Sequence, residues 1–352
     1  MNFPFLKKIV LTSVVVLPFF FSCCDRSQQE GDESAKPDTS TKSVEERKSC
    51  ITVKLLSDSH NLKLGDKPEF KVDIIDSLNA ETYVVNYNGK EIARQKLTDN
   101  IYVWNTENAR VGENILSFEV DNKECTSAET IKVSLGSDTK PKELSYEVKQ
   151  IYPHDVLAYT QGLFFKDGFL YEATGLRGES TIRKVELESG EVIQSFAIPS
   201  EIFGEGITYY DGKIIQLSWN SGRGFVYDFK DFSQIEEFQY FGEGWGLENF
   251  NDKLYMTDGS HKIRVLETTA YTVIRTLEVY DDEGPVNYLN ELEFIDGKIW
   301  ANIYRHEKIA IIDPHSGKVE AYINFRRLLP MNDYNSTTDV LNGIAYDKEN
   351  NR

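Results

Sequence analysis

The tetrapeptide Phe-Gly-Glu-Gly occurs twice in the chain and places a single carboxylate between two glycines, at Glu205 and again at Glu243. A carboxylate among apolar side chains is suited to proton transfer, because the loss of solvation favours its neutral form. Phe203 begins the first copy, and Trp219 ends the strand-like segment that follows it. The pattern predicts a general acid or base in an apolar pocket at Glu205, and it raises the question whether Glu243 does the same work.

Other polar and aromatic residues recur in similar surroundings. Gln161 lies two residues after Tyr159, as Glu205 lies two residues after Phe203, and Tyr304 ends another strand-like segment. Aromatic side chains with a few convergent polar groups are the usual form of a small-ligand site, although each aromatic alone is as well explained as core. We interpret these residues together as one pocket.

From residue 144 onward the chain repeats itself, with unit starts 40 to 52 residues apart. Each unit opens on a variable residue, usually followed by glycine, then Leu or Ile, then in most copies an aromatic and an Asp-Gly turn or a relative of it. Two more segments with period-two alternation complete the unit, which excludes a helical repeat. Units of this length with about four short strands are typical of propeller blades. Five starts predict an all-β fold with a five-bladed β-propeller at residues 144–352.

The innermost strand of each blade lines the central channel of a propeller, so equivalent positions of the units converge on one site. Those positions hold four polar residues and one aromatic: Gln161, Glu205, Trp245, Asn290 and Asn342. Structural positions of this kind are more often small or apolar, so the set favours a functional site. Glu243 is out of this register by two residues. We therefore predict Glu243 at the channel mouth or in the loop above it, with far less effect on activity than Glu205.

The fifth unit contains only its first strand before Arg352. We expect residues 144–154 to form an outer strand that closes the ring against this last, incomplete blade. A ring open at one blade would expose unpaired strand edges, so we also expect the native protein to extend past Arg352.

Residues 1–22 are interpreted as a lipoprotein signal peptide. Two lysines precede an apolar run of 13 residues, which is too short for a comfortable membrane span, and Ser22 stands directly before Cys23 as in a bacterial lipobox. Acyl chains on Cys23 would then hold the exported protein to a bacterial membrane, in the periplasm or at the cell surface. An ordinary cleaved signal and an N-terminal anchor are the alternatives.

Two segments separate this signal from the repeats. Residues 23–49 are polar and lack aliphatic periodicity, so we expect a disordered tether. Residues 50–136 alternate apolar with polar residues and contain an Asn-Gly hairpin turn, which predicts a small immunoglobulin-like β-sandwich, either a spacer or a binding module. Because an exported chain meets an oxidising compartment, we expect Cys50 and Cys125 to pair in a disulfide.

Other chemistries find little support in the residues. The five histidines show no metal-ligand spacing, and no CxxC, HExxH or GxSxG motif occurs. The segment GEGWG precedes a strand and not a helix, which argues against a phosphate loop. Calcium bound by channel oxygens, as in lactonase-type propellers, is left open by the Asp and Asn residues. The net charge of −18 disfavours nucleic acid as a partner.

Seven motifs of the repeats, in this order, resemble the glutamine cyclotransferases of the plant and bacterial type: YTQGL, FGEGIT, LSW, GWGL, LNELE, IWANIY and LNGIA. The resemblance spans residues 152–352 and leaves the tether and the sandwich outside. It implies a five-bladed propeller that converts the N-terminal glutamine of peptides to pyroglutamate and releases ammonia by a zinc-free mechanism. No cofactor is expected to be required, and a structural calcium stays an open alternative.

The resemblance also implies roles for single residues. Glu205 would be the general acid/base that takes a proton from the attacking α-amine and gives one to the departing amide nitrogen. Gln161 and Asn290 would hydrogen-bond the scissile amide or the developing oxyanion. The other site residues would bind the substrate and fold its side chain into a near-attack shape. These are Trp219, Trp245, Phe203, Tyr159, Tyr304 and Asn342.

The chain departs from the family pattern in two ways. Tyr159 and Tyr304 stand where related members often have Phe and Trp, and a lysine usual near the site in the last blade is not reached before Arg352. Two rival functions stay open: a non-catalytic surface propeller that binds peptide or glycan, and a calcium-dependent lactonase-like hydrolase. The expected partners are peptides or proteins with N-terminal glutamine, and the expected state is a monomer.

Overall fold

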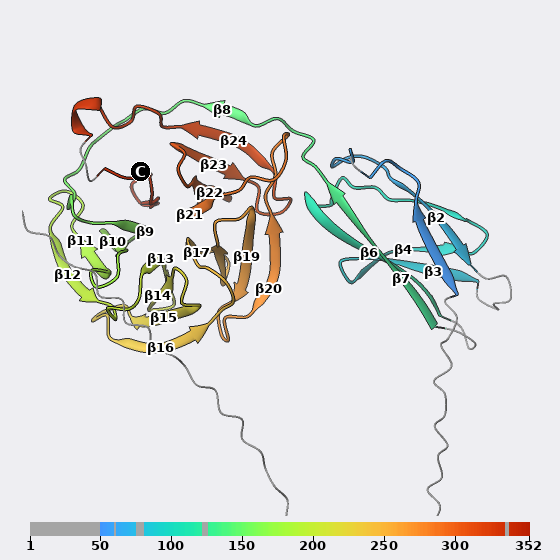
Figure 1. Ribbon diagram of the computed structural model, residues 1–352, viewed down its shortest axis with the longest axis horizontal. Helices are drawn as coiled ribbons and strands as arrows, with labels where there is room; N and C mark the ends of the chain where they lie inside the picture. Colours follow the sequence, from blue (N-terminus) through green and yellow to red (C-terminus); the bar gives the residue numbers. More distant parts are fainter. Residues whose placement is uncertain (1–49, 60, 75–80, 122–125, 335–337) are drawn as a thin grey trace, which may run out of the picture. The chain divides into compact units, whose positions relative to one another are not determined.

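The computed structural model describes residues 50–59, 61–74, 81–121, 126–334 and 338–352, and in these ranges its regular structure is almost entirely β (Figure 1). A short 3-10 helix at Met331–Asp333 is the exception. The expected all-β fold is therefore confirmed. In the described part of the chain, no helix has the length and apolar character needed to cross a membrane.

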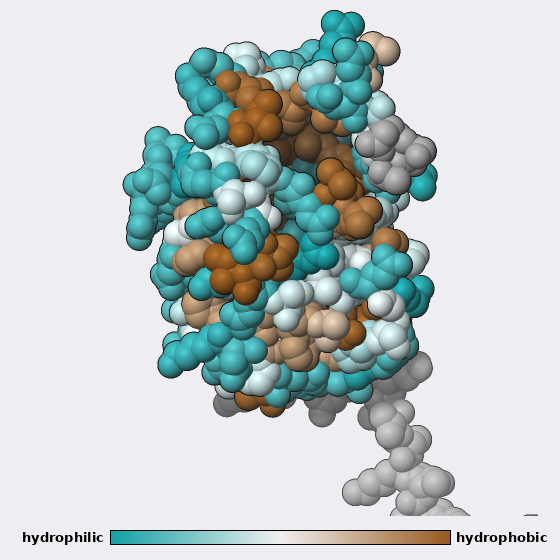
Figure 2. Space-filling view, turned by 90° about the vertical axis from the view of Figure 1, so that its left-hand side faces the viewer, coloured by the Kyte–Doolittle hydropathy of each residue, from teal (hydrophilic) through white to brown (hydrophobic). Residues whose placement is uncertain are grey.

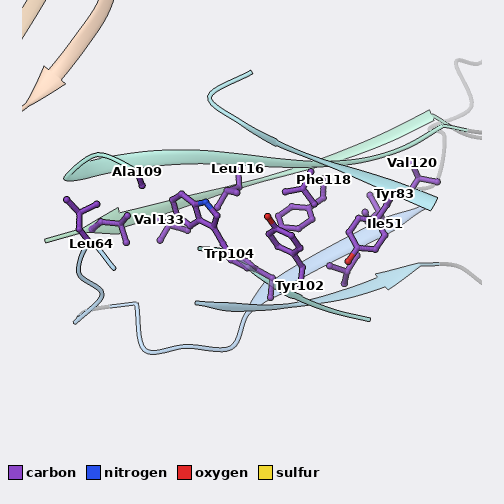
Figure 3. Packing of buried hydrophobic residues seen from close by; sticks show 14 of the residues in the cluster. Ile51, Leu64, Tyr83, Tyr102, Trp104, Ala109, Leu116, Phe118, Val120 and Val133 are labelled. Atoms are coloured by element: carbon purple, nitrogen blue, oxygen red, sulfur yellow. The ribbon is translucent and has the colours of Figure 1, made fainter. Parts of the chain in front are cut away.

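The first seven strands form two sheets with an apolar core between them. A three-stranded sheet has the order β1–β2–β5, and a four-stranded sheet has the order β4–β3–β6–β7. Tyr83, Trp104 and Phe118 are among the large side chains buried between the sheets (Figure 3). The strand bounds are β1 Ile51–Leu55, β2 Glu69–Ile74, β3 Thr82–Tyr87, β4 Lys90–Lys96, β5 Ile101–Val103, β6 Gly112–Asp121 and β7 Thr126–Leu135.

Several expectations from the sequence fall outside the described residues. The signal peptide, Cys23 and the tether lie within residues 1–49, and Cys125 lies within residues 122–125. Cys50 is described, and it is disulfide-bonded. The pairing of Cys50 with Cys125 stays a prediction.

Four antiparallel meanders of four strands follow, and they give the molecule a propeller-like region. Their first strands, β9, β13, β17 and β21, lie nearest a common centre, and the later strands of each sheet lie progressively outward (Figure 1). This order is the one that the repeats predict. The bounds are β9 Thr160–Lys166, β10 Phe169–Thr174, β11 Thr181–Val185, β12 Val192–Ala197, β13 Gly204–Tyr210, β14 Lys213–Ser218, β15 Arg223–Asp228, β16 Gln234–Gln239, β17 Leu247–Asn249, β18 Lys253–Thr257, β19 Lys262–Glu267, β20 Val273–Glu278, β21 Leu289–Ile295, β22 Lys298–Ile303, β23 Lys308–Ile312 and β24 Val319–Asn324.

Asp-Gly turns of the repeats join the two innermost strands in three of the four sheets, and Asn251-Asp252 takes their place between β17 and β18. Asp167, Asp211 and Asp296 have φ angles of 51°, 46° and 50°, and the glycine after each also has a positive φ. Only residues that tolerate the left-handed region fit a two-residue turn of this kind, so the turn sets the register of the hairpin. The register in turn decides which residues of the inner strand face the centre.

The outer strand that precedes the repeats differs from the expectation. β8, Lys142–Leu144, pairs in parallel with β24 and becomes the outermost strand of the fourth sheet. The prediction of an outer strand at residues 144–154, closing against the last blade, was wrong. Without β8, the outer edge of β24 would expose unpaired backbone groups. β8 pairs with this edge and covers it.

The fifth unit forms no strand within residues 338–352. Its backbone amides bond side chains instead of a neighbouring strand: the Gly343 amide donates to Asn302 Oδ1 at 3.1 Å, and the Ile344 amide donates to Glu291 Oε2 at 2.7 Å. The inner strand predicted for a fifth blade is thus an irregular segment, whose end lies inside the ring of sheets (Figure 1).

The outermost strands expose a few apolar side chains, such as Ile193 on β12, Ile235 on β16 and Ile274 on β20. On the side of the molecule drawn in Figure 2, apolar patches are broken up by hydrophilic side chains. Charged and polar residues between such patches limit self-association along the sheet edges.

Candidate active site

Glycines of the repeat bring the inner strands close enough for their side chains to form one ring. A Cβ atom at Gly206 would lie 2.5 Å from the backbone nitrogen of Leu247. A Cβ atom at Gly246 would lie 2.3 Å from the backbone oxygen of Asn290. Both glycines directly follow a predicted ring position, and only a residue without a side chain permits this approach. The sequence motif therefore reflects the close contact between successive inner strands.

Three of the predicted ring residues form a chain of amide hydrogen bonds. Asn290 Nδ2 donates to Asn342 Oδ1 at 3.0 Å, and Asn342 Nδ2 donates to Gln161 Oε1 at 3.2 Å. Asn290 is only 4% exposed, and within the described residues its Oδ1 has no hydrogen-bond partner. A buried acceptor without a partner is costly, so this oxygen is available to accept a hydrogen bond from a bound molecule or from water.

Glu205 lies on β13, which packs against the Gln161 strand β9, and 6% of its surface is exposed. Burial raises the pKa of its carboxyl well above the usual range, and the negative charge of Glu243 raises that pKa further. Glu205 also contributes, after larger effects, to the raised pKa values of Tyr159 and Tyr240, which places both phenols near it. A neutral carboxyl group has both a donor and an acceptor, so it can take one proton while giving another.

The predicted aromatic residues form two edge-to-face groups. Tyr159 and Phe203 have ring centroids 6.2 Å apart, and Phe203 and Trp219 have centroids 5.6 Å apart. Trp245 and Tyr304 form the other group, with centroids 5.3 Å apart and an interplanar angle of 84°. All five side chains are half-buried, so each ring offers an apolar surface to the pocket.

Two further glycines leave room for these rings. A Cβ atom at Gly175 would lie 2.5 Å from the ring of Phe203, and one at Gly259 would lie 2.6 Å from the ring of Trp245. Gly259 also has a positive φ of 78°. Both rings therefore rest directly on backbone, which limits their motion.

Glu243, which is out of register with the predicted ring positions, connects the two aromatic groups. Trp219 Nε1 donates to Glu243 Oε2 at 2.9 Å, and Trp245 Nε1 donates to the same oxygen at 2.8 Å. Glu243 lies in the loop between β16 and β17 and is exposed, as predicted. What the sequence analysis missed is its contact with both tryptophans. The repeated tetrapeptide was the one signal that pointed to this residue.

Asp339 is a second residue that the sequence analysis missed. Tyr159 Oη donates to Asp339 Oδ2 at 2.6 Å, and this bond adds to burial in raising the pKa of Tyr159. The two residues lie 180 positions apart, and Asp339 belongs to none of the repeat motifs. No sequence signal could have joined them.

Three more carboxyl groups lie on the inner strands: Glu291 and Glu293 on β21 are buried, and Glu248 on β17 is partly buried. Glu291 takes the place of the repeat glycine, and its carboxylate oxygens accept the backbone amides of Leu163 and Ile344. Burial raises the pKa of all three, that of Glu248 to about 7. Among the described residues, no group of three or more His, Cys, Asp or Glu is arranged to hold a metal ion.

Comparison with known proteins agrees with the sequence motifs. Residues 119–352 match the family described as glutamine cyclotransferase. Over 219 residues the chain is 33% identical to a glutaminyl-peptide cyclotransferase of Arabidopsis thaliana, which covers 60% of this chain and 68% of that protein. The crystal structure of Myxococcus xanthus glutaminyl cyclase is similar with a TM-score of 0.57 and 30% identity, over 60% of this chain and 91% of that one. The matched family region begins within β6 and contains every residue of the ring.

Proposed function

The chain belongs to the glutamine cyclotransferase family, and from this premise we propose how its side chains turn the N-terminal glutamine of a peptide into pyroglutamate. It is a glutaminyl-peptide cyclotransferase. In this reaction the α-amine nitrogen bonds to the side-chain carbonyl carbon, and the bond from that carbon to the amide nitrogen breaks. The amine loses a proton, the amide nitrogen gains one, and ammonia leaves. The rival readings, a non-catalytic binding module and a calcium-dependent hydrolase, gain no support from these matches.

The buried carboxyl of Glu205 is the observation that carries the mechanism. Its raised pKa favours the neutral form, which can accept a proton from the attacking amine at one oxygen and donate its own proton to the leaving nitrogen from the other. Both transfers then occur without a net charge on the carboxyl. Buried solvent-poor surroundings favour this exchange over ionisation.

The amide chain supplies the complementary contacts. Asn290 Oδ1, which lacks a protein partner among the described residues, would accept an N–H of the substrate's side-chain amide. Gln161 uses its Oε1 to accept from Asn342, so its Nε2 is left to donate to the oxygen that becomes negative during attack. Asn342 is then a positioning residue that fixes both amides in these orientations.

The aromatic residues would fold the substrate. A glutamine side chain is flexible, and ring closure requires its carbonyl carbon to lie against its own α-amine. Walls at Phe203, Trp219 and Trp245 restrict the side chain to such folded shapes, and holding reactants in a near-attack geometry is a large part of the rate enhancement for ring closure.

A coupled ammonia assay on a Gln-initiated dipeptide tests this assignment. We expect Glu205→Gln to lower kcat by about 100-fold or more, the usual scale for a positioned acid or base, while the protein stays folded. Glu179→Gln, at an exposed carboxylate in the loop after β10, is the matched control and keeps wild-type turnover. Unimpaired ammonia release by Glu205→Gln would show that another group moves the protons.

We also propose the finer architecture that the repeats suggest. The four meanders and the segment from Asn342 would be five blades of one propeller, with the fifth incomplete, and the two N-terminal sheets would be an immunoglobulin-like sandwich at residues 50–136. The four sheets, whose first strands lie nearest a common centre, support the first of these (Figure 1). An experimental structure of the chain would show whether the inner positions close into a ring of five.

The location follows from the N-terminal sequence. We propose that residues 1–22 direct export, that Cys23 is acylated, and that residues 23–49 tether a monomer with a Cys50–Cys125 disulfide to a bacterial membrane. A Cys23→Ser variant would then leave the membrane fraction. We propose further that catalysis requires no metal and that any calcium is structural, so that EDTA leaves ammonia release unchanged.

A further inference from the structure

Glu243 is an exposed carboxylate, but its side chain accepts hydrogen bonds from the aromatic residues of the pocket. Both indole N–H groups of the pocket donate to one oxygen, Oε2. Its other oxygen, Oε1, has no protein hydrogen bond within the described part of the chain, and the side chain is exposed at the end of the two aromatic groups. A carboxylate held by two donors at one oxygen presents the second oxygen in a fixed direction.

The loop that carries Glu243 is itself held in place. Arg264 on β19 donates from Nη1 to the backbone oxygen of Phe241 at 2.5 Å and from Nη2 to that of Glu243 at 2.6 Å. The Gly244 amide donates to the backbone oxygen of Trp219 at 2.9 Å. The Arg264 side chain is 14% exposed and pairs with Asp258 at 3.4 Å, so its charge is already balanced by a neighbour. These hydrogen bonds therefore fix the backbone of the loop that carries the Glu243 carboxylate.

We propose that Glu243 is the recognition site for the positively charged α-amine of the substrate, as well as the residue that positions Trp219 and Trp245. This inference rests on the proposed function. A peptide that begins with glutamine carries an ammonium group on the same carbon as the side chain that must fold. A carboxylate between the two tryptophans would hold this group at the edge of the pocket, where the side chain can enter between the rings.

The division of charge around the pocket favours Glu243 for this task. Glu205 is buried and its environment favours the neutral carboxyl, so it offers little attraction to a cation in the ground state. Glu243 is close enough for its negative charge to act on Glu205. Asp339 accepts the hydroxyl of Tyr159, so one pocket donor orients its carboxylate where two orient that of Glu243. Arg177 lies near the Trp219 ring, 6.0 Å from its centroid, and donates to Asn220 Oδ1.

Steady-state kinetics with two ligands separates recognition from positioning. The substrate is a Gln-initiated dipeptide, and the competitive inhibitor is the same dipeptide with hydrogen in place of its α-amino group. In Glu243→Gln an oxygen remains for the indole donors, but the charge is lost. We expect KM for the dipeptide to rise about tenfold, as for loss of a charge-assisted contact, while Ki for the desamino inhibitor changes less than about twofold.

Controls assign each outcome. Glu179→Gln removes an exposed carboxylate from the loop after β10 and leaves both constants unchanged. Glu243→Ala, which removes the acceptor as well, raises both KM and Ki. If KM and Ki rise together in Glu243→Gln, or if neither rises, the recognition role is wrong. Absence of ammonia release by the wild-type protein would instead overturn the proposed function, before any variant is compared.

Discussion

The raised pKa of Glu248 predicts how the free energy of unfolding depends on pH. Glu248 lies on β17 and accepts a hydrogen bond from Thr208 Oγ1 at 2.9 Å. The mutation Glu248→Gln keeps the shape of the side chain and an oxygen for this bond, and it removes the group that can ionise. We expect the variant to gain stability relative to the wild-type protein as the pH rises.

The size of the effect follows from the pKa of Glu248. Burial raises this pKa from its ordinary 4.5 to about 7. Between these values the folded protein keeps a proton that the unfolded chain has lost, so the free energy of unfolding falls as pH rises. One such group contributes up to about 1.4 kcal/mol per pH unit, or about 3 kcal/mol across the window. The same direction holds for Glu205, Glu291 and Glu293, whose pKa values are also raised.

Urea unfolding at several pH values between 4.5 and 7 measures this dependence. A Trp104→Phe background removes the tryptophan of the N-terminal core, so the fluorescence of the other three, Trp219, Trp245 and Trp300, reports on the propeller-like region. Glu236→Gln, an exposed carboxylate on β16, is the control for the change in net charge. Its stability relative to wild type stays nearly constant over the same range.

A difference in free energy of unfolding between Glu248→Gln and wild type that stays constant with pH would contradict a raised pKa of Glu248. If the free energies of unfolding of Glu248→Gln and wild type differ by the same amount at pH 4.5 and pH 7, to within about 1 kcal/mol, Glu248 ionises with little hindrance in the folded protein. A difference that grows by about 3 kcal/mol in favour of the variant is the expected result. A difference that grows in the opposite direction would mean that the native structure stabilises the charged form.

Three further outcomes are expected. As pH rises through the raised pKa of Glu205, kcat/KM falls, because the neutral carboxyl is lost; in Glu243→Gln this fall moves to lower pH in a pH–rate profile, because a neighbouring negative charge is gone. Gly246→Ala lowers Tm and costs about 1–3 kcal/mol, measured by calorimetry, since its Cβ would lie 2.3 Å from the Asn290 backbone oxygen. Asn342→Leu lowers kcat about 10- to 100-fold with little change in KM, measured in the ammonia assay, because both amides that it orients are released.

The sequence predicts the inner strands well, because each repeats the same turn at the same distance from the ring position. Asp-Gly turns with positive φ set the register, and the glycine after the ring position sits against the backbone of the next strand. These are local rules, and they are enough to place Gln161, Glu205 and Asn290 on neighbouring strands that face one centre. The same rules fail at the fifth unit, where the side chains of Glu291 and Asn302 accept the backbone amides that a strand would pair.

Contacts between separate parts of the chain are beyond such rules. Asp339 reaches Tyr159 across 180 residues, and β8 adds to an edge strand that follows it by far more than one repeat. Glu291 shows the limit clearly, because the departure from the repeat glycine is visible in the sequence. The structural role of Glu291 is not visible there, because it depends on the carboxylate accepting the backbone amide of Leu163 on β9.

The two identical tetrapeptides differ in function because their surroundings, and not their own residues, decide the state of each carboxyl. Glu205 lies in a complete inner strand and is covered by its neighbours, which favours the neutral form that exchanges protons. Glu243 precedes a shorter inner strand, stays in the loop, and meets two indole donors. The bound ammonium would first lose one proton to solvent at the edge of the pocket, and the neutral amine would then pass a second proton to Glu205 as it attacks. An exposed charge favours binding of the cation, and a buried neutral carboxyl beside it favours the transfer of the proton.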